Sequence, residues 1–462
     1  MRPQSDEHPR HLEEGAIASE VNRRRFIECA AVIGGAMGLS KSWGAQAAEA
    51  APDPLQPVGE AKGIHPGRVV WVHDPKVLDW EGPGDGHWWE DDHLDQERID
   101  AVTASAVCEL TGTATVGEAW NHLFRYLNGS RGRGDVGYRA GEKVLVKPNW
   151  VGLIWRDKTV DAETYNLVRR LDYMNTAPQL LVALLRQLTG EVGVAPEDIT
   201  VCDTLAYLPN EYYGILHGAF PTVRYEDYAG RFGRIQVQTS DVPFYWSSRP
   251  EGYAQDYVPT CFAEAEYVVN FANLKAHMGS GVTLCAKNHY GSLVRWPVQE
   301  GYYDMHPECF ARESAIYRPL VDLMGHAHLG GKTVLNLVDG LFSGVHPRDA
   351  DPQPMAMPPF DGRWPCSLLA SQDPVAIDSV AFDFLWAERT DFPRQGGADD
   401  YLHEAALAAD PPSGTFYDPN HPEATERLAS LGVHEHWNNA EEKQYSRNLG
   451  IGPGIELVAV TG

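Results

Sequence analysis

The residues with the most obvious capacity for chemistry fall in one short segment, NLKAHMGSGVTLCAKNHYG at positions 273–291. Lys275 and Lys287 each offer a positive point charge. His277 can transfer a proton. The glycine-serine-glycine turn between them precedes a predicted short helix, whose first backbone N–H groups would be free to bind a phosphate or carboxylate. The segment therefore predicts an anion site with a proton-transfer group beside it.

Other polar residues follow short apolar runs of strand length elsewhere in the chain. We expect them to meet the 273–291 segment, because ligands bind beyond the carboxyl ends of parallel strands. The candidate catalytic residues are His277 and Lys275. The candidate anion-binding residues are Lys147, Asn149, Asn273, Gly279, Ser280, Gly281, Lys287 and Asn288. Asp203, Asp339 and Asp373 are expected to orient the lysines or to hold a divalent metal.

Each of these features also has a purely structural interpretation. The 273–291 segment could be a glycine-rich turn whose lysines pair with some of the 64 acidic residues. The loop from His87 to His93 has metal-ligand chemistry, but acidic, aromatic loops are more often solvated surface. The G-x-G-x-x-G match at 132–137 precedes a strand and therefore predicts a turn instead of a dinucleotide site. No G-x-S-x-G or H-E-x-x-H motif supports the corresponding hydrolases.

Strand-like runs alternate with helical patterns along the chain, which indicates an α/β fold. Thr176-Ala177-Pro178 and Asp373-Pro374 are expected to open two of the helices. We predict a largely parallel sheet with helices on both faces and a ligand cleft at the carboxyl ends of the strands. Residues 80–462 are assigned to a single large domain, which has room for two lobes, and residues 48–79 to a linker and N-terminal extension.

The N-terminal segment resembles an export signal. Arg23 and Arg24 precede an apolar stretch from Cys29 to Leu39 that is too short to span a bilayer. Ala45-Gln46-Ala47 fits a cleavage site, so residues 1–47 are predicted to be a twin-arginine signal peptide. The twin-arginine translocase is the expected partner during export, and a soluble periplasmic protein the expected product.

Cysteine spacing and charge narrow the function further. The six cysteines after the signal are widely spaced and form no C-x-x-C pair, so no iron–sulfur cluster is expected and a cysteine-ligated zinc has little support. The formal net charge of −26 argues against a nucleic-acid partner. No run of eighteen apolar residues predicts a membrane span.

Four segments resemble a family of domains of unknown function, number 362. They are VLVKPNWVG, NLKAHMGSGVTLCAKNHYGSL, NLVDGLFSG and SQDPVAIDSVAFDFL. The C-terminal stretch from Gly432 to Asn439, with Lys443 to Ser446, resembles the exported branch of that family. Some members carry ferredoxin-type cysteine clusters, which this chain lacks, and the resemblance implies no particular reaction.

Two classes of function follow. The first is an enzyme acting on a small anionic substrate, with or without a divalent metal. The second is a non-catalytic ligand- or cofactor-binding accessory protein of a periplasmic redox system. The substrate, the cofactor and the oligomeric state do not follow from the sequence.

Overall fold

The computed structural model of the protein describes residues 54–153, 159–168, 172–249, 256–294, 303, 305–346 and 351–462. All of these residues belong to one compact unit, Ala48–Gly462, which is the second of the two units of the chain. The predicted signal peptide, with Arg23 and Arg24, lies outside the described residues.

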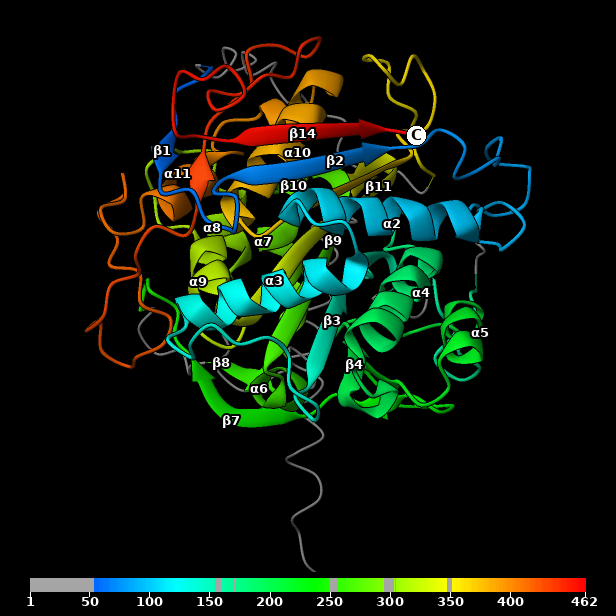
Figure 1. Cartoon of the computed structure of the whole chain (residues 1–462). Helices are drawn as coiled ribbons and strands as arrows, with labels where there is room; N and C mark the ends of the chain where they lie inside the picture. Colours follow the sequence, from blue (N-terminus) through cyan, green and yellow to red (C-terminus); the bar gives the residue numbers. More distant parts are fainter. Residues whose placement is uncertain are drawn as a thin grey trace, which may run out of the picture. The chain divides into compact units, whose positions relative to one another are not determined.

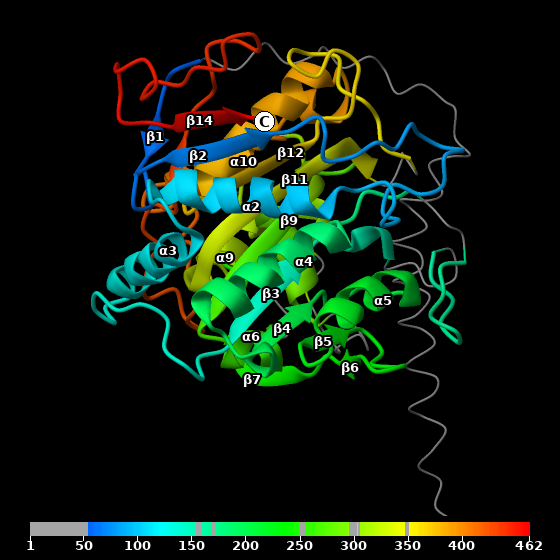
Figure 2. The same cartoon turned by 45° about the vertical axis from the view of Figure 1, so that its right-hand side comes forward.

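A 10-stranded sheet forms the centre of the second unit (Figures 1 and 2). Its strands in spatial order are β14 (Glu456–Thr461), β2 (Arg68–His73), β12 (Ser367–Ser371), β11 (Thr333–His346), β9 (Tyr267–His277), β3 (Val144–Pro148), β4 (Ile199–Cys202), β5 (Arg224–Asp227) and β6 (Ile235–Gln236). One further strand, β10 (Gly281–Thr283), pairs with β9 off this path.

Most neighbours in this sheet are parallel. Every pair from β11 to β6 is parallel, as is the pair of β14 and β2. Only β12, which is antiparallel to both β11 and β2, and β10, which is antiparallel to β9, reverse the direction. The carboxyl ends of β2, β11, β9, β3 and β4 therefore share one edge. The prediction of an α/β fold with a largely parallel sheet is confirmed.

Side chains of successive strand residues enter two different hydrophobic clusters. Val70 and Val72 of β2 belong to the first cluster, whereas Val69 and Trp71 belong to the second. The first cluster includes residues of α2 (Gln96–Thr111), α3 (Val116–Ser130), α4 (Pro178–Arg186) and α5 (Asn210–Ala219). The second includes residues of α7 (Cys285–Asn288), α9 (Pro319–Gly325), α10 (Pro374–Glu388) and α11 (Asp400–Ala406). Such near-continuous apolar strands are typical of sheets that are buried on both sides.

Local sequence explains where several helices begin. The Asp95 and Thr115 side chains cap α2 and α3 by accepting backbone N–H groups. Pro178 and Pro374 stand at the first positions of α4 and α10, where a missing N–H costs nothing. The two helix starts expected from Thr176-Ala177-Pro178 and Asp373-Pro374 are therefore confirmed. Two further helices, α6 (Thr260–Glu264) and α8 (His306–Phe310), are short.

The segment expected to be a linker and N-terminal extension contributes to the sheets. It contains β2 and also β1 (Val58–Gly59), which pairs with β13 (Val433–His434). A second small sheet joins β7 (Thr239–Phe244) and β8 (Asp256–Pro259). Within the described part of the chain, no helix has the length and apolar character needed to cross a membrane.

Candidate functional site

Strand β9 is longer than the sequence analysis predicts. Its apolar run ends at Phe271, but the strand continues to His277, so Asn273, Lys275 and His277 lie within it. Because strand side chains alternate, these three residues share the face on which Phe271 joins the first cluster. Pairing with β10, which sets Lys275 opposite Thr283, extends the strand through polar residues.

Lys275 has a fully buried side chain at the centre of the site. Its Nζ donates hydrogen bonds to Asn149 Oδ1 at 2.9 Å and to the Met174 carbonyl at 2.8 Å. Burial lowers the pKa of Lys275 to about 7, against the opposing pull of Asp339 and Asp203. The side chain can therefore exchange a proton near neutral pH.

Asp339 provides a second buried group that titrates near neutrality. Its carboxylate accepts N–H groups from Ala177 and Leu341. Burial raises the pKa of Asp339 to about 6, although both N–H groups and Lys275 favour the charged form. The pKa of Lys275 is lowered and the pKa of Asp339 is raised, so the two values lie about one unit apart, near neutral pH.

Lys147 at the end of β3 forms an ion pair with Asp203 after β4. The Nζ–Oδ2 distance is 3.0 Å, and Lys147 also donates to the Pro148 carbonyl and to Asn288 Oδ1. Gly291 closes over this pair, since a Cβ there would lie 2.9 Å from Asp203 Oδ1 and 3.0 Å from Lys147 Nζ. The Asp203 carboxylate therefore compensates the charge of Lys147. The sequence instead predicts that this charge binds an anionic ligand.

Two asparagines connect the lysines around the end of β3. Asn149 Nδ2 donates to Asn288 Oδ1 at 3.0 Å, and Asn149 Oδ1 accepts from Lys275. Asn288 Nδ2 donates to the Lys147 carbonyl and to Asn270 Oδ1. These two predicted ligand-binding residues therefore hold the lysine side chains in place.

Two backbone N–H groups of the glycine-serine-glycine turn donate to His277. They are therefore not free to bind an external anion, which is the role that the sequence predicts for them. The backbone N–H groups of Gly279 and Ser280 donate to His277 Nδ1 at 2.9 and 3.2 Å. Gly281 has φ of 84°, and a Cβ there would approach Ala398 Cβ to 2.5 Å, so the turn requires glycine.

These contacts determine the protonation state of His277. Because Nδ1 accepts two hydrogen bonds, Nε2 carries the proton of the neutral ring. Burial, followed by the nearby Lys287 and His346, lowers the pKa of His277 well below its ordinary value. His277 is therefore a neutral hydrogen-bond donor through Nε2, which differs from the proton-transfer role predicted for it.

The start of α7 is also occupied from within the protein. The Asp378 carboxylate accepts the N–H groups of Cys285 and Ala286 at 2.7 and 3.0 Å. The attraction of a helix start for a carboxylate is real here, but a side chain of α10 satisfies it. The expectation that an external anion binds these N–H groups is wrong.

Lys287 is the ammonium group of the site that lacks such compensation. Lys287 is 9 % exposed, and its side chain forms no hydrogen bond or ion pair with another described residue. Its Nζ lies 5.3 Å from the centroid of the Tyr290 ring. Burial lowers the pKa of Lys287, and its charge contributes to the lowered pKa values of Lys275, His277 and His346. Among the described residues, the Lys287 ammonium group therefore has no carboxylate counter-ion.

His346 belongs to the site and was missed by the sequence analysis. After an irregularity between Asp339 and Gly344, β11 realigns so that His346 stands opposite His277. The two ring centroids are 5.4 Å apart. Burial, with Lys275 and Lys287, lowers the pKa of His346 well below its ordinary value. No local pattern marks His346 as a site residue, because it stands seven residues beyond Asp339 and reaches the site only through the bulge.

Two predicted groups lie apart from the site. Asp373 is at the opposite edge of the sheet, because β12 runs antiparallel to β11, and it accepts N–H groups from Lys62, Val375, Ala376 and Val433. It therefore shares no metal with Asp203 and Asp339. In the loop from His87 to His93, ligand atoms of Glu90, Asp92 and His93 come within 4.8 Å of one another, near the surface.

A separate cavity opens on the edge that carries the site. It has a volume of about 220 Å³ and lies at the end of β2, where His73, Trp80, Phe360 and Trp364 are among its lining residues. Phe342 of β11 packs against both tryptophans. None of the lysines of the site lines this cavity.

The fold and the site together define an α/β protein with a buried lysine and histidine cluster at the carboxyl edge of its sheet. The family model described as "Domain of unknown function (DUF362)" matches residues 144–383, which is more than half of the 462 residues. The chain belongs to this family. A search of curated proteins gives no significant match.

Proposed function

We propose that the protein is an exported enzyme that moves a proton to or from a small anionic substrate. The substrate would bind in a cleft at the carboxyl ends of β3, β4, β9 and β11, with helices on both faces of the sheet. The two hydrophobic clusters support this arrangement, because each combines alternate strand residues with a different set of helices.

The observation that carries the proposal is the environment of Lys275. A fully buried ammonium costs free energy unless it is compensated, and burial lowers the pKa of Lys275 to about 7. A proton-transfer group works best when its pKa is close to the working pH. Lys275 is therefore assigned as the group that exchanges the proton.

The remaining residues have distinct roles in this proposal. Lys287 supplies the uncompensated charge that attracts one anionic group of the substrate. His277, a neutral donor through Nε2, stabilises negative charge that develops during the reaction. Asn149 and the Lys147–Asp203 pair are positioning residues, since they contact Lys275 or Asn288. Asp339 tunes the charge of Lys275.

The experiment that tests the proposal needs no knowledge of the substrate. The purified full chain is incubated in D₂O with a panel of small carboxylates and phosphate esters, and deuterium incorporation is followed by NMR. We expect one class of anion to exchange a proton with the wild-type protein. Lys275→Met should abolish the exchange while binding of that anion persists.

Lys287→Met separates binding from catalysis. It should weaken binding of the same anion by about tenfold or more, which corresponds to about 1.4 kcal/mol. Lys332→Met is the matched control, since Lys332 is also partly buried but donates to the Phe262 and Ala263 carbonyls. Unchanged affinity in Lys287→Met would contradict the anion site. Binding without any exchange would instead favour the non-catalytic accessory protein.

A further inference from the structure

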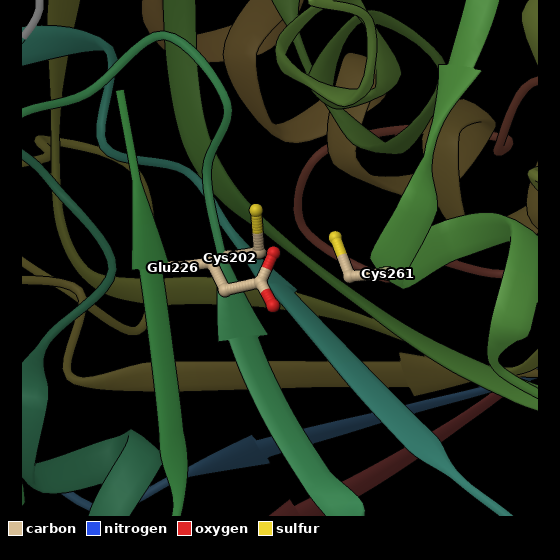
Figure 3. A group of neighbouring side chains, drawn as sticks. All are labelled: Cys202, Glu226 and Cys261. Atoms are coloured by element: carbon tan, nitrogen blue, oxygen red, sulfur yellow. The ribbon is translucent and has the colours of Figure 1, made fainter. Parts of the chain in front are cut away.

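Two cysteines that are far apart in the sequence lie close together beside a glutamate. They are on the face of the sheet that is covered by the second hydrophobic cluster. Cys202 ends β4, Glu226 lies opposite it on β5, and Cys261 is in α6 (Figure 3). Their sulfur and carboxylate ligand atoms all lie within 4.8 Å of one another. Cys202 is fully buried, and Glu226 is 6 % exposed.

We propose that Cys202, Cys261 and Glu226 bind a single zinc-type divalent ion. Thiolates are soft ligands that select Zn²⁺ over Mg²⁺ or Ca²⁺, and a carboxylate oxygen is an accepted third ligand. Donor atoms bound to one tetrahedral Zn²⁺ lie about 3 to 4 Å apart, given bonds of about 2.0 to 2.3 Å. The three donor atoms, all within 4.8 Å of one another, lie close to this spacing.

The charges around the group favour a cation. The contact with Cys261, followed by burial and Glu226, raises the pKa of the Cys202 thiol. The hydrogen bond from Cys202 lowers the pKa of Cys261, but burial and Glu226 raise it above its ordinary value. The negative Glu226 carboxylate therefore disfavours thiolates here unless a cation is bound. On binding, the two thiols release two protons, and Zn²⁺ with two thiolates and one carboxylate leaves one negative charge. Arg224 offsets that charge, because its Nη2 donates to Glu226 Oε1 at 3.1 Å.

A disulfide between Cys202 and Cys261 is the competing state, and it has less support. It would require the sulfur atoms to approach to about 2.05 Å and would leave the Glu226 carboxylate beside the bridge with no metal to bind. The metal also has a structural consequence nearby. Cys202 precedes Asp203, whose carboxylate pairs with Lys147, so the ion would fix the strand end that carries this pair.

The test uses the full chain, purified without a metal-binding tag and kept reduced with a phosphine. Elemental analysis should find one zinc per chain. Titration of the metal-free protein with Co²⁺ should produce thiolate-to-cobalt absorption in the near ultraviolet and tetrahedral bands in the visible. Cys202→Ser and Cys261→Ser should each lose this signal, whereas Cys108→Ser, which changes a cysteine outside the group, should keep it.

Glu226→Gln tests the third ligand, with Glu264→Gln on exposed α6 surface as the matched control. We expect Glu226→Gln to weaken Co²⁺ binding and Glu264→Gln to leave it unchanged. If the cysteine variants do not fold, Zn²⁺ should still raise the melting temperature of the wild-type protein in proportion to the logarithm of its concentration. Absence of Zn²⁺ and Co²⁺ binding by the reduced protein would overturn the proposal. So would a Cys202–Cys261 disulfide, found by mass spectrometry after alkylation, in protein isolated without reductant.

Discussion

At the scale of single residues, the site combines charges that the protein compensates with one that it does not. Lys147 pairs with Asp203, and Lys275 lies near Asp339. Within the described part of the chain, Lys287 contacts the ring of Tyr290 and forms no ion pair. Residue type alone could not distinguish these three lysines. The distinction depends on which acceptors the folded chain brings to each ammonium, and these acceptors come from distant segments.

The lowered pKa of Lys275 predicts how the stability of the protein depends on pH. The folded state has a pKa of about 7 for this group, below the ordinary value of 10.5 in the unfolded state. Between these values the unfolded chain binds more protons, so Lys275 makes the free energy of unfolding rise with pH, by up to about 1.4 kcal/mol per pH unit. This contribution is fully present above pH 10.5 and is lost as the pH falls to 7.

Urea unfolding of wild type and Lys275→Met at several pH values checks this prediction. The difference in free energy of unfolding between them should change with pH in that window, with the wild type gaining stability at higher pH. Lys143→Met, at an exposed lysine on the surface, should run parallel to the wild type. If the free energy of unfolding of Lys275→Met also changes with pH in parallel with the wild type, the pKa of Lys275 is not lowered in the folded state.

At the scale of elements, the sequence predicts where strands and helices begin better than where strands end. Short apolar runs before Lys147 and Asp203 are found as β3 and β4, and the proline-marked starts of α4 and α10 are correct. The ends of β9 and β11 were not predictable, because polar residues such as Asn273 and Asp339 interrupt their apolar runs well before the strands end. Pairing with β10 and the bulge after Asp339 extend these strands, and both depend on partners remote in the chain.

The contact between α7 and α10 explains why the helix start at 285 is unavailable to ligands. Asp378 accepts two N–H groups of α7 and the Tyr401 hydroxyl at 3.1 Å. Asp378→Asn keeps the shape but removes the charge and one acceptor oxygen. We expect it to destabilise the protein by about 1 to 3 kcal/mol, since buried N–H groups would lose their partner.

Denaturant unfolding measures that loss, and Asp410→Asn on the surface is the control that should change stability by less than about 0.5 kcal/mol. Anion binding in Asp378→Asn gives a second readout. Because α7 carries Lys287, a displaced helix start should also weaken the binding of the anion identified in the exchange experiment. A variant with wild-type stability would mean that the two N–H groups do not depend on the carboxylate.

At the scale of the whole molecule, the sheet brings together groups that the sequence separates by up to about 200 residues. Lys147, Asp203, Lys275 and Asp339 meet because β3, β4, β9 and β11 are parallel and end at one edge. The same pattern misplaced Asp373, since nothing in its sequence marks β12 as the reversed strand. Cys202 and Cys261 meet through the packing of α6 on the sheet, which cysteine spacing could not indicate.

Export is the property of the whole chain that remains a prediction, and it has a direct test. The twin-arginine route carries folded proteins, so a metal bound by Cys202 and Cys261 would enter in the reducing cytoplasm, where thiols are kept free for ligation. Replacing Arg23 and Arg24 by lysine should leave the precursor in the cytoplasm of its host, because the translocase reads the arginine pair.

Cell fractionation with mass spectrometry of the N-terminus locates the chain and any cleavage after Ala47. Arg10→Lys, outside the arginine pair, should be exported normally. Normal export of the double variant would refute a twin-arginine signal, and metal loading would then have to be explained in the compartment where the chain is found. If the double variant stays in the cytoplasm with zinc bound, folding and metal binding do not depend on export.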